Sequence, residues 1–189
     1  MKLILVRHGQ SISNKNEIVE GWGDSNLSEL GLEQAKKVAQ RLKEFNPDVI
    51  YCSDLERTRQ TAQPTFEFHT HLIPNFSEDI REYSFGEHEG KTYQFFANYP
   101  VSHYSHPSCE SLEVFNNRIK EFLTQINQKH QGENVIVFTH GWVIFSIIAQ
   151  LQNKDFEDVR GKYIEVGNTS ITIIEDNQLK LFNCTKHLE

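Results

Sequence analysis

The chain has 189 residues, 38% of them hydrophobic and 24% charged, with 19 basic and 26 acidic residues and a net charge of −7. This is the composition of an ordinary globular protein that is long enough for one hydrophobic core. Its acidic balance argues against nucleic acid and anionic membranes as partners. No apolar stretch is long enough for a membrane span, and the three cysteines are widely spaced, which together favour a cytoplasmic location.

Apolar residues recur along the chain in two patterns, one typical of buried strands and one typical of amphipathic helices. The first predicts strands at residues 2–6, 49–52, 134–139, 164–166, 170–174 and 179–183. The second predicts helices at residues 32–45, 53–65, 92–98, 112–126 and 141–151. Ser53 lies three residues before Glu56, a capping-box pattern that starts the second helix there. Asp176-Asn177 is a turn signal between the last two strands.

Two stretches follow neither pattern. Residues 8–28 are polar and predict a loop, and residues 68–110 are irregular. We interpret about 88–110 as a short lid that leaves the core. Strands that alternate with helices imply an α/β layer fold with a mostly parallel sheet. The whole chain, 1–189, is therefore expected to form a single domain with this lid.

Three segments that are distant in sequence place chemically useful residues just after a predicted strand. Arg7-His8 follows the first strand, Arg57 lies after the second, and His140 follows the strand that ends at Thr139. In parallel sheets, ligands bind beyond the carboxyl ends of the strands. We therefore expect two arginines and two histidines to meet at one edge of the sheet, and we know no packing reason for such a meeting.

His8 is the candidate nucleophile. The strand before it fixes its backbone, Gly9 lets the chain turn and a ligand approach, and a neutral imidazole nitrogen can attack phosphorus. Arg7 can hold phosphate oxygens in a bidentate fork. A capped loop histidine beside a surface arginine would give the same three residues, so this run alone is a weak signal.

Arg57 and His140 offer further contacts to a phosphate. Arg57 lies in the first turn of a helix whose amino end points at the crevice, and helix amino ends attract anions. Arg59 is expected to face solvent. A protonated His140 can stabilise charge on the transferring phosphoryl oxygens, although by itself it is better explained by a structural role.

The leaving group of a phosphate ester needs a proton. A carboxyl group that is held neutral near the phosphate can supply it, and burial would raise the pKa of that group. Glu82, Glu87 and Glu89 all lie in the segment 80–90, and the chemistry alone does not choose among them.

Taken together, these residues resemble the histidine phosphatase superfamily, which includes the cofactor-dependent phosphoglycerate mutases. The resemblance extends from the first strand to near Asn168. The matching positions are Leu5-Val6-Arg7-His8-Gly9, Asn14, Gly21, Asp24, Leu27-Ser28, Gly31, Gln34-Ala35, Ser53-Asp54-Leu55, Arg57, Gln60-Thr61-Ala62, Glu82, Gly86, Glu89-Gly90, Glu110-Ser111 and Thr139-His140-Gly141.

The resemblance implies a three-layer α/β/α sandwich and a phosphoric monoester hydrolase that acts on a small phosphorylated metabolite. It implies that His8 becomes phosphorylated and that Glu82 donates the proton. The implied phosphate pocket consists of Arg7, Arg57 and His140, with Asn14 nearby. No metal and no cofactor are implied, and neither the physiological substrate nor the oligomeric state is indicated.

Three residues depart from the family pattern. Gln10 stands where Glu is usual, Trp142 where a small residue is usual, and Phe145 where many relatives have Arg. None of them removes a member of the reaction centre. Trp142 and Phe145 either shape the pocket wall or pack the core of their helix.

The lid bears on the choice between a phosphatase and a mutase. A mutase must hold a doubly phosphorylated intermediate, which calls for extra cations, and mutases of this family have a longer and more basic excursion. Between Lys91 and Glu110 there is no Arg and no further Lys, so water is the expected phosphoryl acceptor. The aromatic lid residues either contact substrate or form a small hydrophobic cluster. They are Tyr93, Phe95, Phe96, Tyr99, His103 and Tyr104.

Other classes of protein fit the sequence less well. A cysteine phosphatase needs an Arg six positions after its Cys, but Thr58 stands there after Cys52. A metallohydrolase would need ligands from four irregularly spaced histidines, a poor pattern for a metal site. These are His69, His71, His103 and His106. A non-catalytic phosphate-binding protein on the same fold is the third alternative.

Overall fold

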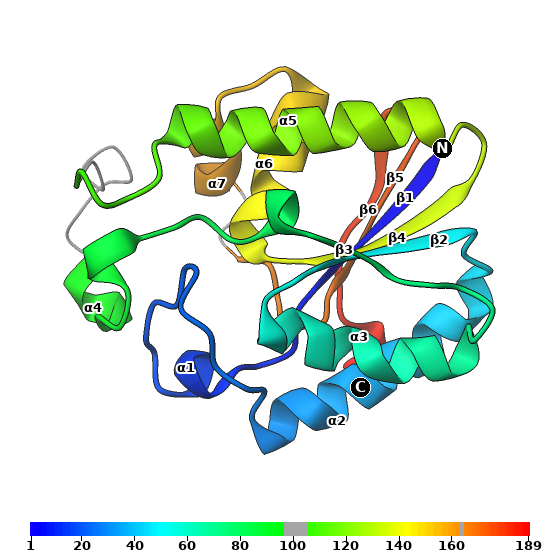
Figure 1. Cartoon of the computed structure of the whole chain (residues 1–189), viewed down its shortest axis with the longest axis horizontal. Coiled ribbons are helices and arrows are strands. Elements are labelled where there is room, and N and C mark those ends of the chain that lie inside the picture. Colours follow the sequence, from blue (N-terminus) through cyan, green and yellow to red (C-terminus); the bar gives the residue numbers. More distant parts are fainter. Residues whose placement is uncertain (97–105, 163–164) are drawn as a thin grey trace.

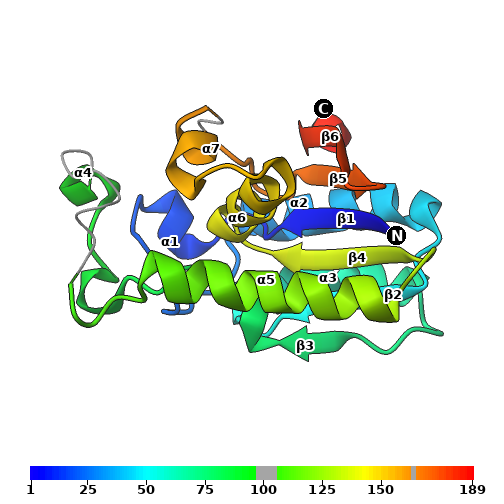
Figure 2. The same ribbon diagram turned by 90° about the horizontal axis from the view of Figure 1, so that it is seen from above.

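The computed structural model describes residues 1–96, 106–162 and 165–189 (Figures 1 and 2). Its strands are β1 (Lys2–Arg7), β2 (Val49–Ser53), β3 (Asn75–Ser77), β4 (Asn134–Thr139), β5 (Ile171–Glu175) and β6 (Gln178–Cys184). Its helices are α1 (Ile12–Lys15), α2 (Glu29–Leu42), α3 (Glu56–Phe68), α4 (Tyr93–Phe96), α5 (Leu112–Lys129), α6 (Gly141–Gln152) and α7 (Phe156–Lys162).

The strands form one sheet in the order β3-β2-β4-β1-β5-β6. The pairs β1–β4, β2–β4 and β2–β3 are parallel, while β1–β5 and β5–β6 are antiparallel. Helices α2 and α3 cover one face of the sheet, and α5 and α6 cover the other (Figure 1). The predicted α/β fold with a mostly parallel sheet between two helical layers is therefore confirmed.

The alternation of side chains along a strand divides the central strands between two cores. In β1, Leu3 and Leu5 pack towards α5 and α6, whereas Ile4 and Val6 pack towards α2 and α3. The residues of β4 divide in the same way. These four residues of β1 are at most 3% exposed, which explains why a near-continuous apolar run appears in the sequence.

Several local predictions were wrong or incomplete. The structure has short elements at α1, β3 and α7 that the sequence pattern did not indicate, because each is too brief to show a period. Glu165-Val166 belong to no strand, and Ile164 lies outside the described residues. The Asp176-Asn177 turn is confirmed, since both residues adopt the positive φ of a tight hairpin.

The capping box predicted at Ser53 is absent. Helix α3 begins at Glu56, its N-cap is Leu55, and no N-cap side chain bonds to it. The Asp24 carboxylate instead accepts a hydrogen bond from the Glu56 amide at 2.5 Å. A carboxylate from a distant loop therefore caps this helix, which leaves the Ser53 hydroxyl for another partner.

The carboxyl ends of β1, β2 and β4 meet at one end of the molecule, where α1 and α4 also lie (Figure 2). This places Arg7, Ser53 and Thr139 at the same edge of the sheet. No helix within the described ranges is both long enough and apolar enough to cross a membrane.

Candidate active site

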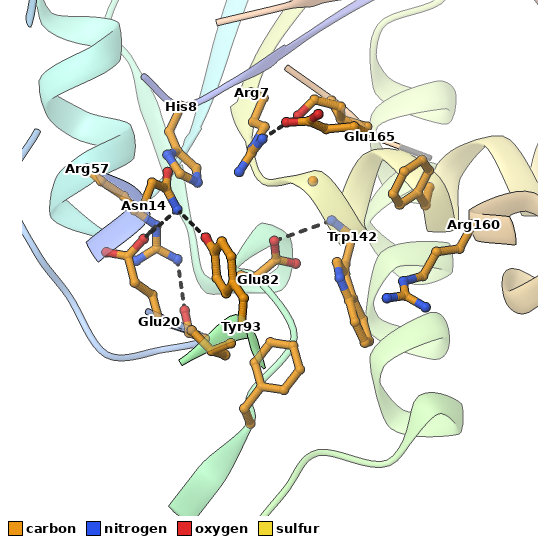
Figure 3. Close-up of a pocket in the computed structure, with 16 residues that line it drawn as sticks. Arg7, His8, Asn14, Glu20, Arg57, Glu82, Tyr93, Trp142, Arg160 and Glu165 are labelled. Atoms are coloured by element: carbon orange, nitrogen blue, oxygen red, sulfur yellow. Dashed lines mark hydrogen bonds and ion pairs between the residues drawn. The ribbon is translucent and has the colours of Figure 1, made fainter. Parts of the chain in front are cut away.

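A cavity of about 520 Å³ opens at this end of the sheet (Figure 3). It includes five of the six residues predicted for the site, namely Arg7, His8, Asn14, Arg57 and Glu82. The other lining residues are Val19, Glu20, Gly21, Phe85, Tyr93, Gly141, Trp142, Phe145, Arg160, Glu165 and Val166. The sixth predicted residue, His140, is not part of the lining but lies next to His8, with the two ring centroids 5.2 Å apart.

The backbone of His8 continues the sheet, and the residue is only 3% exposed. The His8 amide donates to the Thr139 carbonyl at 3.0 Å, which fixes the chain where β1 ends. Ring atom Nδ1 lies 2.8 Å from the Gly9 carbonyl oxygen, so it must donate its proton there. The other ring nitrogen, Nε2, therefore keeps its lone pair in the neutral tautomer.

Burial and the nearby Arg57 and Arg7 guanidinium groups hold the pKa of His8 well below its ordinary value. His8 is thus neutral at physiological pH, the form in which a ring nitrogen can act as a nucleophile. Gly9 is required beside it, because a Cβ at this position would lie 2.8 Å from the Gly31 carbonyl oxygen.

The side chain of Arg57 is 1% exposed and runs from α3 into the floor of the cavity. Its two terminal nitrogens donate to the Gly23 carbonyl at 3.0 Å and to the Gly21 carbonyl at 2.8 Å. The Glu20 carboxylate lies 3.7 Å from its Nε. This network holds the guanidinium in place before any ligand arrives.

Arg7 approaches from the opposite side and donates to the Val166 carbonyl. Burial lowers its pKa, and the Glu82 carboxyl group counteracts part of that effect. Arginine stays charged despite such a shift. The cavity therefore places two guanidinium groups on either side of the His8 ring (Figure 3).

Three buried nitrogen atoms at this site lack a hydrogen-bond partner within the described part of the chain. They are Arg7 Nε, Arg57 Nε and His140 Nδ1. Leaving a buried donor unpaired costs about 1–3 kcal/mol, so native proteins rarely tolerate it without a reason. Their gathering around one histidine fits a site that awaits an anion with several acceptor oxygens.

The structure corrects one detail predicted for His140. Its Nε2 lies 2.8 Å from the Ser53 hydroxyl and 3.3 Å from the Thr58 hydroxyl. Burial, followed by the charge of Arg57, holds its pKa well below the ordinary value. This lowered pKa favours a neutral ring over the protonated one that we expected. A neutral ring can still donate one hydrogen bond, through Nδ1.

Of the three carboxyl groups that the sequence could not separate, only Glu82 lines the cavity. Glu89 accepts hydrogen bonds from the amides of Trp22 and Gly23, at 2.9 and 2.7 Å, and so it fixes a loop. Glu87 is exposed and lies 3.5 Å from His106. Glu82 is thus distinguished by its position in the cavity, which the residue types of this segment do not reveal.

Glu82 is held by two backbone amides. The Tyr83 amide donates to Oε1 at 3.0 Å, and the Trp142 amide, at the start of α6, donates to Oε2 at 3.3 Å. Burial nevertheless raises the pKa of the carboxyl group above its ordinary value. A carboxyl group with a raised pKa beside a neutral histidine has the properties of a general acid.

Asn14 connects the candidate phosphate site with the lid. Its Nδ2 donates to the Tyr93 hydroxyl at 3.1 Å, while its Oδ1 accepts from Asn168 Nδ2 at 3.2 Å. Tyr93 thus lines the cavity, as one reading of the aromatic lid allowed. Phe95 is 42% exposed, and Tyr99, His103 and Tyr104 lie outside the described residues.

Three charged residues of the cavity were missed from the sequence. Glu20 is a nearly buried carboxylate, with 7% of its side chain exposed, that accepts from the Ser11 and Ser25 hydroxyls. Arg160 and Glu165 come from α7 and the segment after it. Glu20 and Arg160 do not directly follow a predicted strand, and Glu165 lies within the one predicted at 164–166. The topological rule selects residues just after a strand, so it could not find these three.

Two of the residues that depart from the family pattern line the cavity. Trp142 packs against Tyr83, Phe85 and Phe156, with ring centroids 4.9 to 5.3 Å apart, and Phe145 is 5% exposed. Both side chains therefore line the pocket and also pack in the hydrophobic core. Gln10 is absent from the lining and accepts a hydrogen bond from Ser28.

The alternative chemistries find little support in the described residues. Cys52 is fully buried, and burial raises the pKa of its thiol, which makes it a poor nucleophile. Within the described ranges, no three His, Cys, Asp or Glu side chains gather in a way that could hold a metal ion. His103, one of the four histidines considered as ligands, lies outside these ranges.

Residues 3–182 match the family model of the histidine phosphatase superfamily, branch 1. The chain belongs to this superfamily. A probable phosphatase of Schizosaccharomyces pombe is 35% identical over all of this chain and 96% of its own length. A metal-independent phosphoserine phosphatase of Arabidopsis thaliana is 34% identical over 79% of this chain and 68% of its own length.

Solved structures of related enzymes have the same fold. The structure of an Entamoeba histolytica phosphoserine phosphatase in complex with 3-phosphoglyceric acid superimposes with a TM-score of 0.84 and 28% identity, over 100% of this chain and 99% of that one. A phosphoglycerate mutase of Staphylococcus haemolyticus also matches in sequence, at 30% identity. The predicted family, fold class and general activity, phosphoric monoester hydrolysis, are confirmed at this level.

Proposed function

We propose that this protein hydrolyses a small phosphorylated metabolite through a covalent phosphohistidine on His8. The observation that carries the proposal is the arrangement of His8 itself. Its Nδ1 is committed to the Gly9 carbonyl, its Nε2 is unprotonated, and it is flanked by two arginines whose Nε atoms make no hydrogen bond within the described part of the chain. Such a site binds a phosphate dianion and presents a nucleophile to it without an additional base.

In the first step the phosphate docks against Arg7, Arg57 and Asn14, and the unpaired Nδ1–H of His140 donates to one of its oxygens. The Nε2 lone pair of His8 forms the N–P bond as the P–O bond of the ester breaks. The leaving oxygen takes the proton of Glu82. Catalysis in this step is mainly positioning and charge stabilisation.

In the second step Glu82, now a carboxylate, accepts a proton from water. The water oxygen forms a bond to phosphorus, and the electron pair of the N–P bond returns to His8 Nε2. Inorganic phosphate leaves, and both Glu82 and His8 regain their starting protonation states. No metal or cofactor enters either step.

The charge of the cavity favours water over a second phosphorylated substrate as the acceptor. Its described lining contains three arginines, whose charge is partly offset by Glu20 and Glu165. A doubly phosphorylated intermediate would need more positive charge than this. Phosphoglycerate mutase activity therefore remains the second candidate, supported by the mutase among the matching proteins.

The proposal keeps the organisation predicted from the sequence, one domain over residues 1–189 with a lid at about 88–110, of which 97–105 lie outside the described residues. A cytoplasmic location also stays a prediction. The partner is a small phosphorylated metabolite, with no role for nucleic acid or a membrane.

Phosphate release from a panel of monoesters, with EDTA present, tests this function. The panel spans aryl phosphates, sugar phosphates, phosphoglycerates, nucleotides and a phosphopeptide, and His8→Ala serves as the inactive variant. Rapid quenching should trap an acid-labile, base-stable phosphoryl group on the wild-type protein and none on the variant. Release that persists in His8→Ala would refute the mechanism, and transfer to phosphoglycerate in place of release would indicate a mutase.

A further inference from the structure

Arg160 has no role in the mechanism above, although it lines the same cavity. It lies in α7, beside Trp142 and on the far side of the pocket from His8 and Arg57 (Figure 3). Its guanidinium carbon is 5.1 Å from the centre of a Trp142 ring. Such stacking fixes the plane of the guanidinium group while its N–H donors stay available.

Comparison with the other stacked arginines shows that Arg160 is unusual. Five described arginines lie over an aromatic ring, namely Arg41, Arg59, Arg81, Arg118 and Arg160. The first four also bind a carboxylate or a backbone carbonyl of the protein. Within residues 1–96, 106–162 and 165–189, the guanidinium of Arg160 has no such partner.

The charge balance of the cavity limits what Arg160 can bind. Arg7 and Arg57 face the phosphate that is transferred, which leaves Arg160 as the third arginine of the described lining. A second phosphate dianion there would meet one cation, with Glu165 in the same cavity. A carboxylate carries a single charge, and its two oxygens match the fork of a guanidinium group.

We propose that Arg160 determines specificity by binding a carboxylate of the substrate, so that the enzyme prefers phosphorylated hydroxy acids or amino acids. The inference rests on the proposed function, since it assumes that the phosphate of the same molecule docks at His8. A cavity of about 520 Å³ holds a molecule of this size, with its phosphate and carboxylate at opposite ends.

Matched pairs of substrates test this preference. O-phosphoserine and phosphoethanolamine differ only by the carboxylate, and 3-phosphoglycerate differs from glycerol 3-phosphate by a carboxylate in place of an alcohol. For the wild-type protein we expect kcat/KM to be higher for the acid of at least one pair by about 10- to 100-fold, the value of a charged hydrogen bond.

Arg160→Leu should remove this preference by lowering kcat/KM for the acid, while the partner without a carboxylate changes less than about threefold. Arg160→Lys, which keeps the charge but not the fork, should retain part of the preference. Arg59→Leu is the matched control, because it removes a stacked arginine that is exposed and lies outside the cavity.

The outcomes separate this inference from the proposed function. Hydrolysis by the wild-type protein with no preference in either pair would overturn the role of Arg160 and leave the phosphohistidine mechanism standing. Equal losses on both members of a pair in Arg160→Leu would show a merely structural role and overturn it as well. No hydrolysis of any ester would refute the proposed function, and the inference would fall with it.

Discussion

Replacing Glu82 by Gln tests the assignment of the general acid in a way that depends on the leaving group. Both Glu82 oxygens accept a backbone N–H, from Tyr83 and from Trp142, so the carboxyl group is already positioned in the ligand-free protein. Gln keeps the size of the side chain but cannot give up a proton. Its amide nitrogen would also face one of these donors, which removes one hydrogen bond.

The expected loss follows from what the proton contributes. A positioned general acid typically accelerates a reaction by about 10²- to 10⁴-fold, and we expect a loss of that size for phosphorylation of His8 by an alkyl phosphate. An aryl ester such as p-nitrophenyl phosphate leaves as a weakly basic anion that needs little protonation. Its phosphorylation rate should therefore fall at least ten times less than that of the alkyl ester.

Rapid-quench measurement of phosphoenzyme formation isolates this step from the hydrolysis that follows. In Glu82→Gln the aryl ester should still give a burst of phosphoenzyme, which then accumulates because no carboxylate activates water. Glu87→Gln, an exposed neighbour in the same segment, should behave like the wild-type protein. Equal losses of phosphorylation rate for aryl and alkyl esters would refute the assignment of Glu82 as the proton donor.

Two further predictions concern the loop that carries Glu82 and the edge of the site. Arg118 binds the nearly buried Glu110 carboxylate at 2.7 Å and donates to the Glu82 carbonyl, so Arg118→Met should cost about 3–5 kcal/mol in urea unfolding. Most of that cost should return when Glu110→Gln is added; a double variant as unstable as the single one would contradict the reasoning. Arg81 lowers the pKa of Asp54, so this pair stabilises the fold above the unfolded-state pKa of Asp54 and loses its effect as the pH falls through the lower folded-state value. Asp54→Asn should therefore cost about 1–2 kcal/mol at pH 7 and progressively less towards pH 3, whereas a difference independent of pH would count against the ion pair.

The sequence was sufficient for the long elements of the fold, and with the family resemblance it indicated most residues that line the candidate site. The buried strands near residues 2–6 and 134–139 appear in the sequence as near-continuous apolar runs, because both faces of each strand are covered by helices. Short elements such as α1 and α7 carry no such signal, since one turn of helix fits many patterns. The start of α3 was misplaced because its cap is the distant Asp24 and not a local side chain.

The same distinction applies to the site. Arg7, His8, Arg57 and His140 were found because each follows a strand of a parallel sheet, a rule that needs only sequence order. Arg160 reaches the cavity from α7, a helix that the sequence did not reveal. Its contribution depends on how α7 packs against Trp142, and that is decided by tertiary structure.

Burial favours the protonation state that the proposed mechanism needs in each of the two reacting groups. The mechanism needs a neutral His8 and a protonated Glu82 at the same time, which reverses their ordinary order of titration. With the ordinary pKa values of 6.5 and 4.5, at the midpoint pH each group is in the required state in about one molecule in eleven, and both are in about 1% of molecules. Burial lowers the pKa of His8 and raises that of Glu82, so it increases this fraction from both sides.

The dependence of kcat/KM on pH should show this effect of burial. Because kcat/KM falls when His8 is protonated and also when Glu82 is ionised, it should be bell-shaped. In Glu82→Gln the residual activity should keep the acidic limb of His8 and lose the alkaline limb. An alkaline limb that survives this substitution would mean that another group donates the proton, and burial would then explain only the state of the nucleophile.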